Sequence, residues 1–453
     1  MLNQKEIFDE IVNNVTINKV AINIGKSKLT LIYHVINGNI QDFYKFYINN
    51  ICEKNISDLD KIYGGIFKKV AIIDSSIANS IICGNVYAIV EEKDIIYEMD
   101  LKKLTIRSPQ DSIIDPVNMY GARDGFIESL YHNIALIERR VSTSKLIINN
   151  MSIGNVTKTN VCVMGISNHC DKSEFKQIID KLKSINIDSI KSINDISSLF
   201  NTNNMFPLIS QTGLPSLAAD YLTQGRIIIL IDNFPMALVL PVTLNDFTSL
   251  RENVLAPPYY SSYQRFITIL MIFFSTFFLG LYVAIMGYHS QNLSLIVISE
   301  IKITSRGATI PLTLEIIIML IIFEFVKVAS YKAPSSNILN IVIVIGGIII
   351  GQNAVNSGFI GAFDIVVTAL CFLSTYGVTN NQYLIIVISI LRVILIIIGA
   401  LFGLLGIICA IIGLIVYLYN IHSLNTKYLT PLAPFSFKNF VKKYFFRKEE
   451  NNA

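Results

Sequence analysis

The sequence predicts an α/β soluble N-terminal region of two small lobes, followed by an all-α polytopic membrane domain. Residues 333–426 form a stretch of 94 residues in which Asp364 and Arg392 are the only Asp, Glu, Lys or Arg residues. A water-soluble domain needs charged residues over most of its surface, so this stretch is expected to lie in lipid. The first 265 residues, by contrast, carry Lys, Arg, Asp or Glu every few positions.

The first lobe is expected to cover residues 1–150. Residues 126–141 have apolar side chains at helical spacing, which predicts an amphipathic helix, and a second helix is predicted at 41–52. We interpret the Glu-Arg-Arg sequence at 138–140 as part of the solvent-exposed face of the first helix. Apolar or β-branched runs predict strands at 29–35, 69–73 and 85–91.

The second lobe is expected to cover residues 151–262. Residues 172–184 have the spacing of an amphipathic helix and lie between apolar runs of strand length. These runs are at 161–166, 226–232 and 236–241. The alternation of strands and helix indicates a small α/β sheet, whose strand order the pattern leaves open.

The membrane domain is expected to cover residues 263–430 and to contain about six spans. A run of about 20 apolar residues crosses the hydrocarbon of a bilayer. The last run, 383–421, has 39 residues, and the glycines at 399 and 403 offer a place for it to turn. The alternative is a broken or re-entrant last segment. The predicted spans are 266–288, 312–328, 338–355, 359–376, 383–400 and 404–421.

Basic residues orient this domain. Five Lys or Arg residues crowd the tail at 431–453, which predicts a cytoplasmic C-terminus. The first 15 residues are polar, without the apolar segment of a signal peptide, so the N-terminal region is expected on the same side. Six spans, an even number, agree with both termini being cytoplasmic, whereas five would not.

Four ionisable residues fall within the predicted spans, where a charge costs about 2.5–3.5 kcal/mol on insertion scales. They are Glu315, Glu324, Asp364 and Arg392. Glu315 and Glu324 are nine residues apart, which places them on opposite faces of one helix. Glu324 and Lys327 have the spacing of an ion pair. Asp364 and Arg392 either neutralise each other or line a hydrated path, and the sequence leaves both interpretations open.

The third predicted span carries small and amide side chains. Gly347 and Gly351 form a GxxxG pattern, which favours close packing of helices. The amides that follow predict, as an alternative, a narrow polar stretch of a pore. The candidate ion-pathway residues are therefore Gln352, Asn353, Asn356, Asp364 and Glu315.

Signatures of catalysis are absent from the sequence. It contains no GxxxxGK[ST], HExxH or GxSxG motif, and its six cysteines show no CxxC or zinc-site spacing. We therefore expect no enzyme activity, no cofactor and no metal site. The net charge of +4 is too small to indicate a nucleic-acid partner.

Several short motifs follow one another in a fixed order. GARDGF at 121–126 and NIALIERR at 133–140 contain Arg123, Asp124, Gly125, Arg139 and Arg140. Further motifs are IG at 153–154, KTNV at 158–161, GR at 225–226, PVT at 241–243, FE at 323–324, GQNAV at 351–355 and LTPLAP at 429–434. Together they resemble the A subunit of the GerA-type spore germinant receptors, from about residue 25 onward. Asn233 follows Asp232 where that family has Gly, which leaves the conformation of this turn open.

The resemblance implies a subunit of a nutrient receptor that triggers spore germination from the spore inner membrane. It implies work with a permease-like B subunit that binds the nutrient and a lipoprotein C subunit, and a homo-oligomer that forms a nutrient-gated ion pathway. Two other functions stay open. A stand-alone secondary transporter would carry an inverted repeat, which the sequence does not show. A membrane-anchored scaffold would leave the intramembrane ionisable groups without a role.

Overall fold

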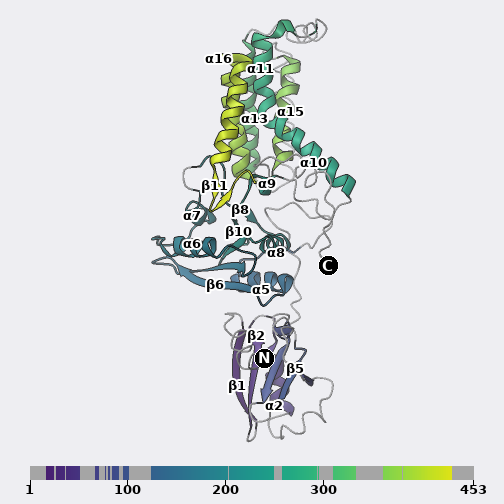
Figure 1. The fold of residues 1–453 in the computed structure, drawn as a ribbon, viewed down its shortest axis with the longest axis vertical. Helices are drawn as coiled ribbons and strands as arrows, with labels where there is room; N and C mark the ends of the chain where they lie inside the picture. The colour runs from purple at the N-terminus through teal and green to yellow at the C-terminus, as the bar shows by residue number, and fades with distance from the viewer. Residues whose placement is uncertain are drawn as a thin grey trace. The chain divides into compact units, whose positions relative to one another are not determined.

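The structure is a computed structural model that describes residues 17–24, 27–35, 37–50, 67–70, 77, 80–81, 84–90, 95–101, 124–201, 204–248, 258–292, 294, 310–332, 361–379 and 381–430. Internal contacts divide the chain into two compact units. Unit 1 is Met1–Thr202 with Ile209–Pro241, and unit 2 is Asn203–Leu208 with Val242–Ala453. Unit 1 contains two five-stranded sheets, and unit 2 contains the long helices (Figure 1).

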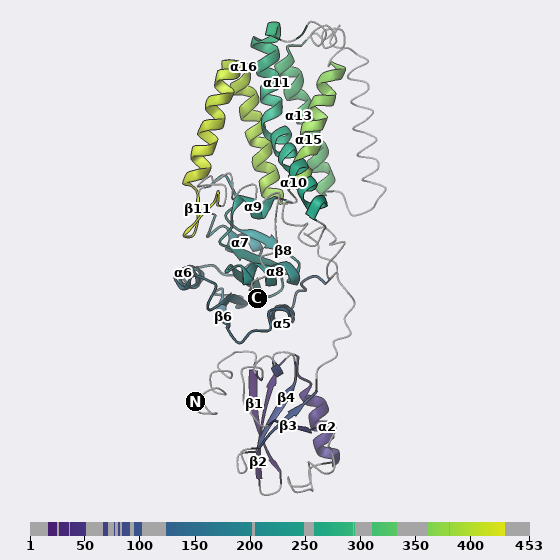
Figure 2. The same cartoon turned by 45° about the vertical axis from the view of Figure 1, so that its right-hand side comes forward.

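The first sheet of unit 1 is antiparallel and carries a helix on one face (Figure 2). Helix α2 (Ile40–Asn50) places Phe43 against Leu29 and Leu31, whereas Ile32 packs in a second cluster. This alternation is the period of two that a strand imposes. The strands, in spatial order, are β1 (Ile17–Ile24), β2 (Ser27–His34), β4 (Val86–Val90), β5 (Ile95–Met99) and β3 (Phe67–Val70).

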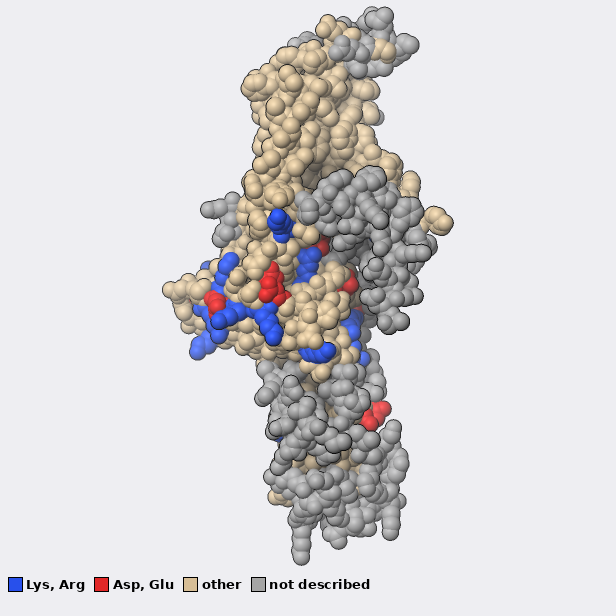
Figure 3. Space-filling view, in the orientation of Figure 1, with Lys and Arg blue, Asp and Glu red and all other residues tan. Residues whose placement is uncertain are grey.

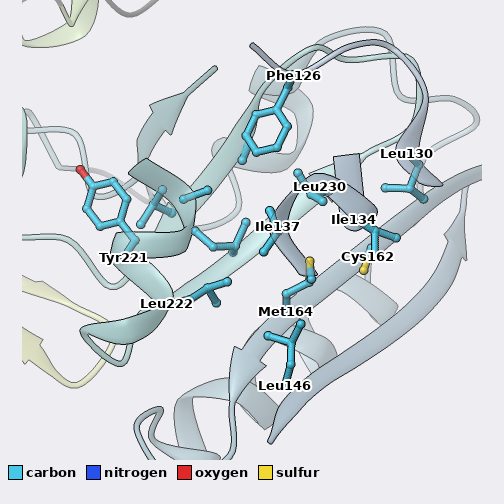
Figure 4. Close-up of a cluster of buried hydrophobic side chains, with 14 of the residues drawn as sticks. Phe126, Leu130, Ile134, Ile137, Leu146, Cys162, Met164, Tyr221, Leu222 and Leu230 are labelled. Atoms are coloured by element: carbon cyan, nitrogen blue, oxygen red, sulfur yellow. The ribbon is translucent and has the colours of Figure 1, made fainter. Parts of the chain in front are cut away.

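The second sheet is also antiparallel. Its strands, in spatial order, are β6 (Leu146–Ile153), β7 (Thr159–Ile166), β9 (Ile227–Ile231), β10 (Ala237–Leu240) and β8 (Ser210–Thr212). Helices α5 (Leu130–Val141) and α8 (Pro215–Thr223) pack on it through one apolar cluster, with Ile134, Ile137 and Leu222 against Met164 and Leu230 (Figure 4). Two further helices are α6 (Lys172–Lys183) and α7 (Ile193–Ser197).

The central strands of this sheet are buried on both faces. Every residue of β9 is buried, as are the last six residues of β7. Strands covered on both sides read as continuous apolar runs, and this is why the sequence identified them. The turn after β9 contains Asn233 with φ 69°. Asn tolerates this left-handed conformation, so it fills the position where the GerA family has Gly.

Strand β6 crosses residue 150, where the sequence analysis ended the first lobe. It pairs along its whole length with β7, and α5 packs on the same sheet, so the second sheet recruits residues before that boundary. The sequence signal was weak because β6 is an edge strand. Its burial alternates irregularly, and Asn149 and Asn150 resemble a turn.

Unit 2 is built from long apolar helices that run alongside one another (Figures 1 and 2). Their shared cluster contains Leu279, Ile316, Val367 and Ile396, one from each of four helices. In chain order the elements are α9 (Leu244–Phe247), α10 (Pro258–Phe273), the π-helical η3 (Phe274–Phe278), α11 (Leu279–Tyr288), η4 (Ser290–Asn292), α13 (Leu312–Lys332), α15 (Ala362–Val378), α16 (Gln382–Asn420), β11 (His422–Ser423) and β12 (Thr426–Lys427).

Helix α16 folds back on itself at Gly403. This residue has φ 61° and ψ −149°, outside the helical region. Leu384 and Leu418, from the two ends of α16, pack in the same apolar cluster. A straight helix of 39 residues would be about 58 Å long and would keep these residues far apart. The long apolar run is therefore a helical hairpin.

The helices of unit 2 expose apolar rather than charged side chains. Figure 3 shows Lys, Arg, Asp and Glu gathered over the sheet region, while the visible face of the helices is almost free of them. Among the described residues, Tyr263–Tyr288 and Gln382–Asn420 are long and apolar enough to cross a membrane, and Ala362–Val378 is a shorter apolar helix. The predicted span 338–355 and the tail 431–453 lie outside the described residues.

Candidate functional site

Asp364 lies in the first turn of α15 and is only 1% exposed. The Tyr282 hydroxyl of α11 donates a hydrogen bond to Asp364 Oδ1 over 2.6 Å. Asp364 Oδ2 is buried and has no hydrogen-bond donor among the described residues. A carboxyl group in such a place has lost its hydration and recovered only part of it from the protein.

Glu315 of α13 lies beside it and is 3% exposed. The main-chain N–H of Gly361 donates to Glu315 Oε2 over 3.2 Å. The carboxyl groups of Glu315 and Asp364 are in hydrogen-bonding contact with each other. The fold thus joins two candidate ion-pathway residues that are 49 positions apart in the sequence, and it holds them inside the helices.

Arg392 of α16 is 1% exposed and is bonded to neutral groups. Its Nε donates to the main-chain carbonyl of Ser275 over 2.7 Å, and its Nη2 contacts Thr375 Oγ1. Ser275 lies in the π-helical η3. A π-turn shifts the main-chain bonding pattern and leaves a carbonyl available to an outside donor, which explains why this guanidinium binds there.

Asp364 and Arg392 do not neutralise each other among the contacts that the structure describes. Arg392 reaches Thr375, which lies 11 residues beyond Asp364 on α15, or about 16 Å along the helix. The mutual-neutralisation interpretation is therefore wrong. It had no other basis than the scarcity of charge in this stretch, which does not fix the height of a side chain in a bundle.

Glu324 and Lys327 form the ion pair that their spacing predicted. Lys327 is buried, and its Nζ also contacts Ser389 Oγ of α16 over 3.2 Å. Glu324 is about one third exposed. The pair therefore fixes α13 against α16 rather than standing in solvent.

The remaining candidates divide by position. Gln352, Asn353 and Asn356 lie outside the described residues, as does Arg123. In unit 1, Arg140 pairs with Asp124 and also donates to the carbonyl of Leu136 over 2.9 Å. Gly125 is buried beside Phe126 at the edge of the second sheet, and Arg139 is exposed. These motif residues fix the segment that leads into α5.

Glu138 corrects the interpretation of 138–140 as a solvent-exposed face. Its Oε2 lies 2.7 Å from His34 Nε2, and both side chains are fully buried. The main-chain N–H of Asn37 donates to His34 Nδ1 over 3.1 Å, so Nε2 carries the proton and donates to Glu138. The partner lies 104 positions away, and no local pattern signals it.

Sequence reasoning also missed Tyr282 and Ser275. Each was counted as one residue of an apolar span, because a tyrosine or a serine has no formal charge. The available signal was a hydroxyl within a long apolar helix, since such groups usually bond across helices.

Two antiparallel sheets with helices, joined to long apolar helices that enclose ionisable side chains, define a membrane-associated protein with a separate α/β region. Ionisable groups so placed are typical of functional sites. The chain belongs to the family of Bacillus/Clostridium GerA spore germination proteins, whose family model matches residues 5–452. This confirms the resemblance that the motifs indicated.

Relatives of the chain carry the same description. It is 30% identical over 364 residues to Spore germination protein XA of Bacillus anthracis, covering 80% of this chain and 73% of that protein. It is 30% identical over 348 residues to Spore germination protein KA of Bacillus subtilis, covering 75% of this chain and 62% of that protein, less than two thirds of its length. The N-terminal domain of the A subunit of the Bacillus megaterium spore germinant receptor GerK3 matches with 24% identity and a TM-score of 0.39, over 52% of this chain and 92% of that one.

Proposed function

We propose that this chain is the A subunit of a nutrient receptor that triggers spore germination from the spore inner membrane. The observation that carries the proposal is the family match over residues 5–452. The names of the relatives from Bacillus anthracis and Bacillus subtilis, both spore germination proteins, support a role in germination. By family membership, its partners are a permease-like B subunit and a lipoprotein C subunit.

The proposed mechanism is a nutrient-gated ion pathway between several copies of the chain. Glu315, Asp364 and Arg392 are each sealed inside one copy, so they line no water-filled path there. Val366 and Leu373 of α15 are 64% and 66% exposed, and such an apolar face packs against lipid or against another copy. A path between copies would take its polar wall from Gln352, Asn353 and Asn356.

The proposed topology has six spans with both termini on the cytoplasmic side. The hairpin of α16 supplies two antiparallel arms, which supports counting the last apolar run as two spans. Nutrient binding by a partner subunit would act by favouring one of two arrangements of the helices, because a ligand shifts an equilibrium only by its differential affinity for the two states.

Ion flux from proteoliposomes tests the proposal. Vesicles containing this chain with its B and C partners should release cations when nutrient is added. Gln352→Leu should preserve assembly and lower the nutrient-triggered flux. The matched control is Gln291→Leu, at an exposed position of η4, which should leave the flux unchanged. Equal flux in the wild type and Gln352→Leu would remove this amide from the pathway.

The same preparation separates the alternative functions. A secondary transporter would move solute in vesicles that contain this chain alone. A membrane-anchored scaffold would give no flux in either preparation while still binding its partners. Nutrient-dependent flux that requires the partners is the result that the proposed receptor predicts.

A further inference from the structure

Three helices of unit 2 converge on one pair of carboxyl groups. Tyr282 comes from α11, Glu315 from α13 and Asp364 from α15. The donors that reach the pair are the Tyr282 hydroxyl, 2.6 Å from Asp364 Oδ1, and the Gly361 N–H, 3.2 Å from Glu315 Oε2. Both carboxyl side chains are buried and touch each other.

The positive groups of the surrounding helices are engaged elsewhere. Arg392 of α16 binds Ser275 and Thr375. Lys327 of α13 binds Glu324 and Ser389. Among the described residues, then, no cation contacts Glu315 or Asp364. Two carboxylates in contact without a cation repel strongly in a medium of low dielectric, so both cannot stay ionised.

Asp364 Oδ2 shows what the pair needs. It is buried, and the described residues offer it no donor. The neighbouring polar group is the Glu315 carboxyl, which is itself an acceptor when ionised. One proton on either group converts this acceptor–acceptor contact into a hydrogen bond from acid to carboxylate, which is among the stronger kinds in proteins.

We propose that Glu315 and Asp364 form a binding site for a single proton, shared between α13 and α15 and oriented by Tyr282. The bound proton holds the two helices together. Its loss places two like charges in contact and drives α13 away from α15. This goes beyond the proposed receptor function, and the site holds its proton whether or not the helices conduct ions.

Infrared difference spectroscopy of the full chain in lipid nanodiscs tests the site. The wild type at neutral pH should show the C=O stretching band of a protonated carboxyl. Either Glu315→Gln or Asp364→Asn should shift or remove this band, and the double variant should lack it. Tyr282→Phe should keep the band and shift it, because Asp364 loses one donor. Glu324→Gln, the matched control on α13, should leave the band unchanged.

Two results would overturn the proposal. One is a wild-type spectrum at neutral pH without a protonated carboxyl band, and this arm needs no variant to fold. The other is a band that persists unaltered in both single variants. Thermal unfolding supplies an independent readout: the wild type should melt at lower temperature above the pH at which its band disappears, and a melting temperature that stays constant there would contradict the link to helix packing.

Discussion

Arg392 Nε donates a hydrogen bond over 2.7 Å to the main-chain carbonyl of Ser275, within a π-helical turn 117 positions earlier in the chain. This bond joins α16 to the first long helix of unit 2 and places a buried positive charge on a main-chain dipole. A second contact to Thr375 joins α15 to the same guanidinium. One side chain thus connects three helices.

Arg392→Lys is expected to lower the stability of unit 2 by about 2 kcal/mol, the usual range for a lost hydrogen bond to a charged group. An ammonium cannot reproduce the planar fork that reaches Ser275 and Thr375 together. Thermal unfolding in detergent measures the loss. Arg139→Lys, on the exposed end of α5, is the control and should change little. A lysine variant as stable as the wild type would show that the fork carries no stability.

Gly403→Ala is expected to weaken the hairpin of α16 by about 1–2 kcal/mol, because φ 61° strains a residue with a side chain. An added Cβ would also meet Tyr288 Cγ and Cδ2 at 3.2 Å. Gly413 offers a matched control in the same helix, since a Cβ there meets nothing within 4 Å. Gly413→Ala should be neutral or stabilise by up to about 1 kcal/mol. The ranking of the two variants in thermal unfolding decides the point.

Glu138→Leu is expected to destabilise unit 1 by about 3 kcal/mol, because it leaves the buried His34 Nε2–H without its carboxylate. Hydrogen exchange in α5 of the full chain should rise accordingly. The same substitution at exposed Glu128 is the control and should have little effect. Unchanged exchange in the Glu138 variant would mean that this buried bond contributes nothing net.

Asp195 should make the stability of unit 1 depend on pH. Its carboxylate accepts hydrogen bonds from the main-chain N–H groups of Ser192 (2.9 Å) and Lys191 (2.7 Å), and these hold the pKa of Asp195 below its ordinary value of 3.8. The stabilisation is therefore fully present above that ordinary value and is lost as the pH falls through the lowered one.

Asp195→Asn tests this dependence. The variant should be less stable by about 1 kcal/mol at neutral pH, the usual worth of a helix cap, and the difference should vanish in acid. Exposed Asp180 of α6 provides the control substitution, Asp180→Asn. Chemical denaturation across the acid range measures both variants, and a difference that persists undiminished at the lowest pH would contradict the role given to the charge.

Prediction from the sequence was strongest where one local pattern suffices. The runs at 161–166 and 226–232 became β7 and β9, because buried central strands are apolar at every position. The last apolar run became a hairpin because its length exceeds one helix span and Gly403 permits a positive φ. Strand β6 was missed, since an edge strand with two asparagines has no such pattern.

Partners across the fold could not be predicted in this way. The sequence placed Glu315, Asp364 and Arg392 in apolar helices, but not the height and rotation of each helix against its neighbours. Those two quantities decide that Asp364 meets Tyr282 and Glu315 instead of Arg392. They also decide that Glu138 is buried on His34 rather than exposed beside Arg139.

By itself, then, the sequence determined the division into an α/β region and apolar helices, the candidate ionisable residues and the GerA family, because composition, periodicity and short motifs are local properties. Only the tertiary structure decided which of those residues touch. Contacts between side chains many positions apart depend on how whole elements pack, and packing is fixed by the summed fit of many side chains rather than by any single segment.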